Sequence, residues 1–156
     1  MNRISLAVVL ILVPAFVRAD DPPSAPAGPP PTGADHKEPE TELGGKMGKM
    51  NGAFRKLRRQ AGDATKNAES LQLVATLREN AEAAAKLVPA KADSIPEADR
   101  AKWIEGYKSK MAEMIEAIGK LEAAFKADNN EEAVKIVQSL GALQKDGHGE
   151  YRKKEH

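Results

Sequence analysis

The sequence contains no cysteine among its 156 residues, and this absence excludes two kinds of site. The chain can form neither disulfide bonds nor thiolate metal centres. Aromatic residues make up only 4% of the chain, and the formal net charge is only +1. This composition suits a single small domain and gives no bias toward nucleic acid or an acidic surface as a partner.

Motifs of known catalytic sites are also missing from the sequence. It contains no H-E-x-x-H motif, no phosphate-binding glycine loop beside a strand, and no Ser/His/Asp set. Hydrophobic residues do not alternate with a period of two over a useful length, so strands are not expected. The sequence therefore predicts an all-α protein that is not an enzyme.

Hydrophobic runs long enough to span a membrane are absent as well. The apolar run at residues 4–13 has about ten residues, too few for a bilayer core of about 30 Å. It follows Arg3 and precedes Val17-Arg18-Ala19, a small-residue site that resembles A-x-A. Residues 1–19 are therefore predicted to be a secretory signal peptide that is cleaved after Ala19. A retained signal anchor is the alternative.

Seven of the ten prolines lie between residues 20 and 40, where they alternate with small residues. This composition predicts an extended, polyproline-like linker rather than part of a core. Residues 41–156 are predicted to form the folded domain.

Hydrophobic residues in this domain recur every three or four positions, the spacing of one buried stripe on a helix. Four such stripes follow one another along the chain. They consist of Leu43, Met47, Met50, Phe54 and Leu57; of Leu71, Val74, Leu77, Ala81, Ala84 and Val88; of Trp103, Tyr107, Met111, Met114, Ile118, Leu121 and Phe125; and of Val134, Val137, Leu140, Gln144, His148 and Tyr151.

Helix boundaries are indicated by breaks and capping signatures. The pattern breaks at residues 62–67, and Pro89 ends the second helix. Residues 94–97, Ser-Ile-Pro-Glu, predict a capping box with proline in the first turn, and Asn129 with Glu132 repeats the signature. Short loops between four amphipathic helices favour an antiparallel up-down-up-down four-helix bundle.

This topology brings the start of the first helix and the end of the fourth to one end of the bundle. Met47 and His148 each lie about five residues from their helix end, hence about 7 Å deep at about 1.5 Å per residue. Pro89, Trp103 and Tyr107 belong to the same end. A thioether and an imidazole that face each other across an apolar slot are the axial ligands of a b- or c-type haem with a raised potential.

Glycines are frequent near both of these residues. Each glycine costs a helix about 0.5–1 kcal/mol relative to alanine. Close approach of the backbone to a flat ligand is one explanation, and a fold under weak stability demand is the other. The glycines concerned are Gly44, Gly45, Gly48, Gly52, Gly147 and Gly149.

Residues 42–152 resemble the cytochrome b-562 family, the periplasmic four-helix b-type cytochromes. The pieces that match in order and spacing are L-x-x-x-M-x-x-M-x-x-x-F at residues 43–54, Leu77-Arg78 followed by Ala85-Lys86-x-x-Pro89, Trp103-x-Glu-Gly-Tyr107, and His148-x-x-Tyr151-Arg152. Two positions depart from the family pattern. Ala90 replaces a second proline, and Gln144 replaces a basic residue four positions before the histidine.

The resemblance implies a periplasmic electron-transfer protein that binds one haem b without covalent bonds. It implies Met47 and His148 as axial ligands and Arg152 near a propionate. It further implies that the pocket is walled by Leu43, Met50, Pro89, Trp103 and Tyr107. Covalent attachment through C-x-x-C-H is impossible without cysteine. The expected partners are redox proteins of unknown identity and not nucleic acid. The protein is expected to be a monomer, and not integral to the membrane if the signal peptide is cleaved.

Three alternatives remain at this point. Met50 lies one turn deeper than Met47 and is a conceivable ligand in its place. A haem-free exported bundle could bind a soft metal such as Cu(I) through Met47, Met50 and His148, or bind client proteins. A structural bundle could have no cofactor at all. Both charge signs are expected along every helix, without a concentrated docking patch.

Overall fold

Residues 41–153 are described by the structure, which is a computed structural model. The predicted signal peptide and linker, residues 1–40, lie outside this range and stay predictions. None of the helices in the described range combines the length and hydrophobicity needed to cross a membrane.

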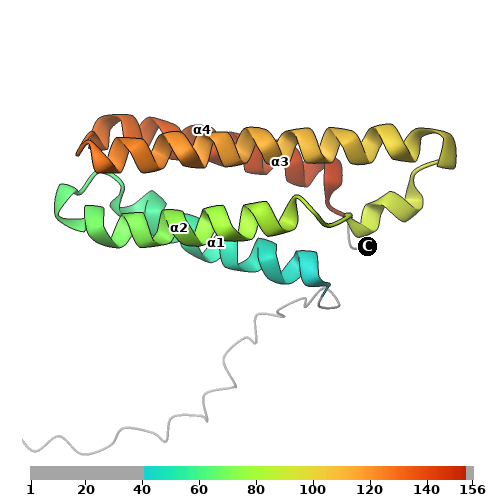
Figure 1. The fold of residues 1–156 in the computed structure, drawn as a ribbon, viewed down its shortest axis with the longest axis horizontal. Coiled ribbons are helices and arrows are strands. Elements are labelled where there is room, and N and C mark those ends of the chain that lie inside the picture. The colour runs from blue at the N-terminus through green and yellow to red at the C-terminus, as the bar shows by residue number, and fades with distance from the viewer. Residues whose placement is uncertain (1–40, 154–156) are drawn as a thin grey trace, which may run out of the picture. The chain divides into compact units, whose positions relative to one another are not determined.

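Four long helices and two short 3-10 helices make up residues 41–153, and this range contains no strand. The helices pack as an antiparallel four-helix bundle in which sequence neighbours lie side by side (Figure 1). The all-α, up-down-up-down prediction is confirmed. In chain order the elements are α1 (Glu42–Gln60), η1 (Ala64–Lys66), α2 (Asn67–Ala84), η2 (Ala90–Ser94), α3 (Glu97–Lys126) and α4 (Asn130–Tyr151).

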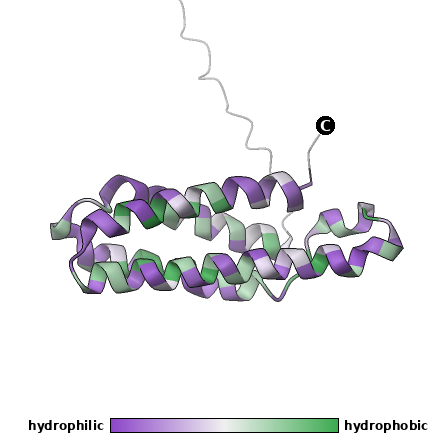
Figure 2. Ribbon diagram, turned by 90° about the horizontal axis from the view of Figure 1, so that it is seen from above, coloured by the Kyte–Doolittle hydropathy of each residue, from purple (hydrophilic) through white to green (hydrophobic). Residues whose placement is uncertain are grey.

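One stripe from each helix forms the core, because each helix is amphipathic and buries only its apolar side. Figure 2 shows the hydrophobic and hydrophilic residues in bands along each helix. The largest fully buried hydrophobic side chains are Leu57, Val74, Ile118, Leu121 and Phe125. Burial of each such side chain stabilises the fold by about 1.5–3 kcal/mol.

Side-chain caps fix the starts of α1 and α4. The Gly44 amide donates a hydrogen bond to Thr41 Oγ1 at 3.0 Å, and the Glu132 amide donates to Asn129 Oδ1 at 3.1 Å. Each cap satisfies an amide that has no partner within its helix. The cap predicted at Asn129 is confirmed.

The second helix ends earlier than predicted. It stops at Ala84, and Val88, predicted as the last residue of its stripe, is 54% exposed. Lys86 N donates to Ala83 O, and Leu87 N donates to Ala84 O. Each of these hydrogen bonds spans three residues instead of the four of an α-helix, so the end of the helix is tightened. The chain then leaves the helix before Pro89, whose ring disfavours helical geometry at the preceding residue.

The predicted capping box before α3 is wrong. Ser94 Oγ donates to Lys91 O at 2.6 Å, and Pro96 occupies the N-cap position without a side-chain cap. With φ −51° and ψ 140°, Pro96 is extended, so the helix begins only at Glu97. Ser94 is then too far from the first helical amides to cap them. Glu97 and Asp99 instead place negative charge in the first turn, where the helix dipole favours it.

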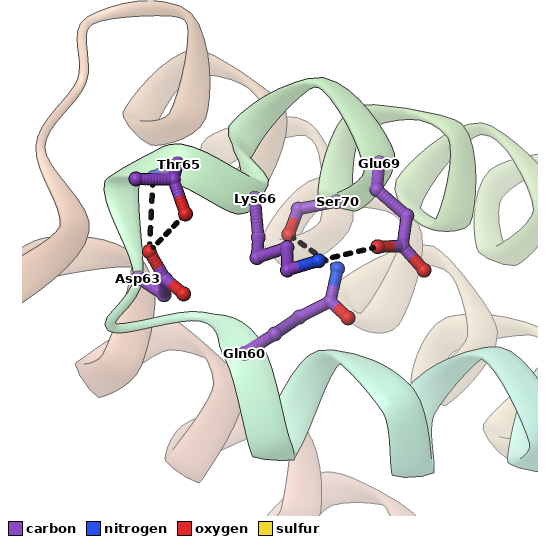
Figure 3. A network of polar contacts seen from close by, with 6 residues as sticks. All are labelled: Gln60, Asp63, Thr65, Lys66, Glu69 and Ser70. Atoms are coloured by element: carbon purple, nitrogen blue, oxygen red, sulfur yellow. Dashed lines mark hydrogen bonds and ion pairs between the residues drawn. The ribbon is translucent and has the colours of Figure 1, made fainter.

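Two polar clusters hold the end of the bundle where α1 meets α2. In Figure 3, Asp63 Oδ1 accepts hydrogen bonds from Thr65 N and Thr65 Oγ1, and Gln60 Nε2 donates to Ser70 Oγ at 3.0 Å. The two Thr65 hydrogen bonds lower the pKa of Asp63.

The second cluster joins this connection to the turn between α3 and α4. Asn67 Nδ2 donates to Asp128 Oδ1, and Asn130 Nδ2 donates to Ala61 O, each at 2.8 Å. Asn67 was predicted to belong to the break but begins α2 and is buried. Its burial is possible because these amide groups satisfy one another.

Candidate haem site

The opposite end of the bundle gathers the segments that carry the predicted site residues. The first turns of α1, the α2–α3 connection and the last turn of α4 lie there (Figure 1). Tyr107 Oη donates to Ala84 O at 2.9 Å, and Lys91 Nζ donates to Glu150 O. These hydrogen bonds tie the end of α2 to α3 and the α2–α3 connection to the end of α4.

A mainly apolar cavity of about 80 Å³ opens between the helices in this half of the bundle. All four methionines of the described range line it. The other lining residues are Phe54 from α1, Leu77 from α2, Tyr107, Lys110 and Ile118 from α3, and Leu140, Leu143, Gln144, Gly147, His148 and Tyr151 from α4.

The two predicted axial ligands line this cavity from different helices. Met47 lies on α1, five residues after Glu42, and is half-buried; His148 lies on α4, three residues before Tyr151, and is exposed. α1 and α4 contact each other less than the other neighbouring helices do. The two side chains therefore border the part of the bundle that is packed least tightly.

The geometry does not separate Met47 from Met50 as the ligand. Met50 is buried, with 6% of its surface exposed, and lines the same cavity one turn further in. Ligation by Met47 and His148 stays a prediction.

Three aromatic side chains pack together beside His148. The ring centroids of Trp103 and Tyr151 are 4.9 Å apart, and those of Tyr107 and Tyr151 are 5.4 Å apart at 66°. Such tilted and edge-on pairs are favourable beyond their burial. An added Cβ at Gly106 would lie 2.9 Å from Tyr151 Oη, so glycine permits this approach of α4 to α3.

Burial raises the pKa of both tyrosines of this cluster. It raises the pKa of Tyr107 to about 12. Burial, followed by the hydrogen bond and charge of Glu150, also raises the pKa of Tyr151. The last turn of α4, which carries His148, is therefore held by an uncharged aromatic contact.

Four of the predicted site residues do not line the cavity. Leu43 and Trp103 are partly buried and pack against the core, and Pro89 is buried just before η2. Arg152 is exposed, and its backbone amide donates to His148 O at 3.2 Å. The predicted roles of these residues toward a haem stay predictions.

Several lining residues were not predicted as site residues. Met111, Met114 and Tyr151 belong to the stripes seen in the sequence, so a signal for them was present. Lys110 is different, because a lysine between hydrophobic positions normally indicates the exposed side of a helix. Only the packed structure shows that its long side chain reaches the cavity.

The glycines near Met47 and those near His148 differ in whether they line the cavity. An added Cβ at Gly147 or Gly149 would meet nothing within 4 Å, and only Gly147 lines the cavity. Gly45, Gly48 and Gly52 also face open space, but none of them lines the cavity. Close approach to a ligand in the cavity therefore does not explain these three glycines of α1.

The chemistry of the lining fits a haem, whereas the volume requires some movement. Thioether and imidazole groups are suitable axial ligands, and an apolar wall suits a porphyrin ring. A volume of about 80 Å³ is below the roughly 300–1,000 Å³ of cofactor pockets, so lining side chains must shift to admit a ring. Methionine side chains are unbranched and flexible and can make this adjustment.

Comparison with known protein families identifies the family of this bundle. The sequence model of the family described as cytochrome b562 matches residues 42–152, well over half of the chain. No curated protein and no solved structure matches the chain significantly. Proteins of the matched family bind haem b without covalent bonds and carry electrons, and they are periplasmic in general. The chain belongs to the cytochrome b562 family.

Proposed function

We propose that this protein is a periplasmic one-electron carrier that holds one haem b between Met47 and His148. One observation supports this most directly: a thioether of α1 and the imidazole of α4 border the same apolar cavity, within the region that matches the family. The haem, when bound, supplies the redox couple.

The surrounding residues determine what the site can do. Met47 and His148 would hold the haem iron and leave no position open to oxygen or a substrate. The thioether and the apolar lining, including Met50 and Leu140, would favour the reduced form and raise the potential. The arrangement therefore suits outer-sphere electron transfer without further chemistry.

Lys110 is proposed to pair with one haem propionate. It is the one basic residue, apart from His148, among the cavity-lining residues in the described part of the chain. Its Nζ lies 2.9 Å from Glu113 Oε2, and this hydrogen bond raises the pKa of Lys110. Lys110 would thereby supply from α3 the positive charge that Gln144 does not supply from α4.

Export accounts for the segments before the bundle. We propose that residues 1–19 direct the chain to the periplasm and are removed after Ala19, and that residues 20–40 form a linker. The redox partners are proposed to be proteins met transiently by a monomeric bundle.

Reconstitution with haem tests this function. The reduced protein is expected to show the sharp visible bands of six-coordinate, low-spin iron. A Met47→Ala, His148→Ala double variant should lose them, whereas Met114→Ala, which changes another cavity methionine, should keep them. A flat spectrum, or equal spectra for parent and double variant, contradicts the proposal.

A second candidate function is supported by the methionines. Met47, Met50, Met111, Met114 and His148 line one cavity, and soft thioethers prefer Cu(I). Titration of the haem-free protein with Cu(I) in the presence of a chromophoric competitor tests it. Binding that is lost in a Met111→Leu, Met114→Leu variant would favour a copper site, and no competition would exclude it.

A further inference from the structure

The charges of the bundle are not distributed evenly among its helices. α1 carries six basic residues and one acidic residue, a net charge of +5. α2 carries one basic and three acidic residues, and α3 carries six of each. α4 carries two basic and four acidic residues, with His148 counted as neutral. The expectation that both signs are spread along every helix is wrong for α1. The low charge of the whole chain conceals this asymmetry.

The outward side of α1 presents four of these cations. We call Lys49, Arg55, Lys56 and Arg59 the α1 basic face; all four are exposed. At about 100° per residue, they lie on the half of the helix opposite Met50 and Leu57. No residue of this face forms an ion pair or a side-chain hydrogen bond within residues 41–153.

Four cations on the other helices are closely paired with carboxylates, although Lys102 and Lys108 of α3 and Lys145 of α4 form no ion pair within residues 41–153. Lys110, Lys120 and Lys126 of α3 each have a carboxylate oxygen within 3 Å, as does Arg78 of α2. Like charges on α1 therefore repel one another without local compensation, which costs stability at low ionic strength. An acidic surface placed against the α1 basic face would remove this cost.

The backbone of α1 is also accessible between these cations. Gly45, Gly48 and Gly52 recur at the spacing of one helix side, and an added Cβ at each would meet nothing within 4 Å. These glycines leave the backbone uncovered by side chains on the same outward side of the helix, next to Lys49 and Lys56. A partner can approach closely there because no side chain stands in the way.

The position of the α1 basic face relates it to the candidate haem site. Met47 and Met50 line the cavity from the inner side of the same turns that carry Lys49. A helix with its side chains is about 10–12 Å thick, so a molecule bound beside Lys49 lies about one helix thickness from the cavity. Arg55, Lys56 and Arg59 lie about 8–14 Å further along α1 than Met50, at about 1.5 Å per residue. The separation at Lys49 suits electron transfer between docked proteins.

We propose that the α1 basic face is the docking surface for an acidic electron-transfer protein. The inference deepens the proposed function and rests on it. A membrane is the less suitable occupant, because a membrane-bound helix inserts apolar side chains, whereas those of α1 lie in the core. Complementary charge instead steers a transient protein partner and speeds its encounter.

Reduction of the haem-loaded protein by flavodoxin hydroquinone, an acidic protein donor, tests the proposal in a stopped-flow instrument. The test variant is Lys49→Gln, Arg55→Gln, Lys56→Gln, Arg59→Gln. The matched control is Lys86→Gln, Lys102→Gln, Lys108→Gln, Lys145→Gln, which removes the same charge from exposed positions outside α1. Haem content and helicity are measured first, so that a failure to bind haem is seen separately.

The second-order rate of the parent is expected to fall at least roughly tenfold between about 10 and 200 mM salt. At low salt the test variant should be at least about fivefold slower than the parent, with a weaker salt dependence, and the control should stay within about twofold. Equal slowing of both variants, or no slowing of the test variant, overturns the proposal.

A second measurement does not depend on haem. Amide chemical shifts of the labelled haem-free protein, titrated with oxidised flavodoxin, should change mainly along α1. Shifts confined to other helices overturn the proposal. So does binding to phosphatidylglycerol vesicles that requires the α1 basic face while flavodoxin causes no shifts, since the membrane would then be the occupant.

Discussion

Tyr107 shows how one residue couples burial to local structure. Its phenol is buried and donates its hydrogen to Ala84 O, the last carbonyl of α2, which also accepts a hydrogen bond from Leu87 N. The same burial raises the pKa of Tyr107 to about 12. Its ionisation in the folded state therefore requires more alkaline conditions than in the unfolded chain.

This pKa predicts a pH dependence of stability. Because the folded pKa lies above the ordinary value of 10, the folded state is favoured fully below pH 10 and loses this advantage as the pH rises toward 12. The loss is about 2–3 kcal/mol. Chemical denaturation at several pH values should show a smaller alkaline loss in Tyr107→Phe than in the parent. Equal slopes would contradict the assignment.

Lys110 gives a prediction for haem affinity. Lys110→Gln should weaken haem binding about two- to fivefold, the range of a partly exposed ion pair. Glu113→Gln, which removes the present partner of Lys110, should not weaken it. Haem titration measures the affinities, and thermal unfolding of the haem-free proteins checks that the fold is unchanged. Equal affinities of parent and Lys110→Gln would exclude the propionate role.

Among the elements, the long helices could be predicted from the sequence and their connections could not. Apolar residues at three- and four-residue spacing are enough to locate α1, α3 and α4, since packing of that stripe decides helix formation. The region around Pro89 and Pro96 was predicted poorly. Its course depends on hydrogen bonds between distant residues, such as Tyr107 to Ala84, which no local pattern contains.

The last turns of α4 provide a test at this scale. Gly147→Ala and Gly149→Ala should each stabilise the haem-free protein by about 0.5–1 kcal/mol, because alanine favours a helix and the added Cβ meets no atom. Only Gly147 lines the cavity, so only Gly147→Ala should lower haem affinity. Denaturant unfolding and haem titration of both variants measure this. Unchanged affinity in Gly147→Ala would make that glycine incidental to binding.

For the whole molecule, the antiparallel topology explains why distant residues share one cavity. Met47 and His148 are about a hundred positions apart, yet both border the cavity because α1 starts where α4 ends. This part of the site could be predicted from helix order, although His148 lies three residues from the end of α4 rather than the predicted five or so. Lys110 could not be assigned in the same way, since its place depends on how side chains fill the space between helices.

The ligands of the iron test the central claim most directly. A methionine methyl group bound to haem iron lies over the ring and is shifted far upfield by the ring current. In the reduced, haem-loaded protein with labelled methionine methyl groups, NMR should show one such signal, and Met47→Leu should abolish it. Loss of the signal in Met50→Leu instead, or no upfield methyl signal in the parent, would contradict ligation by Met47.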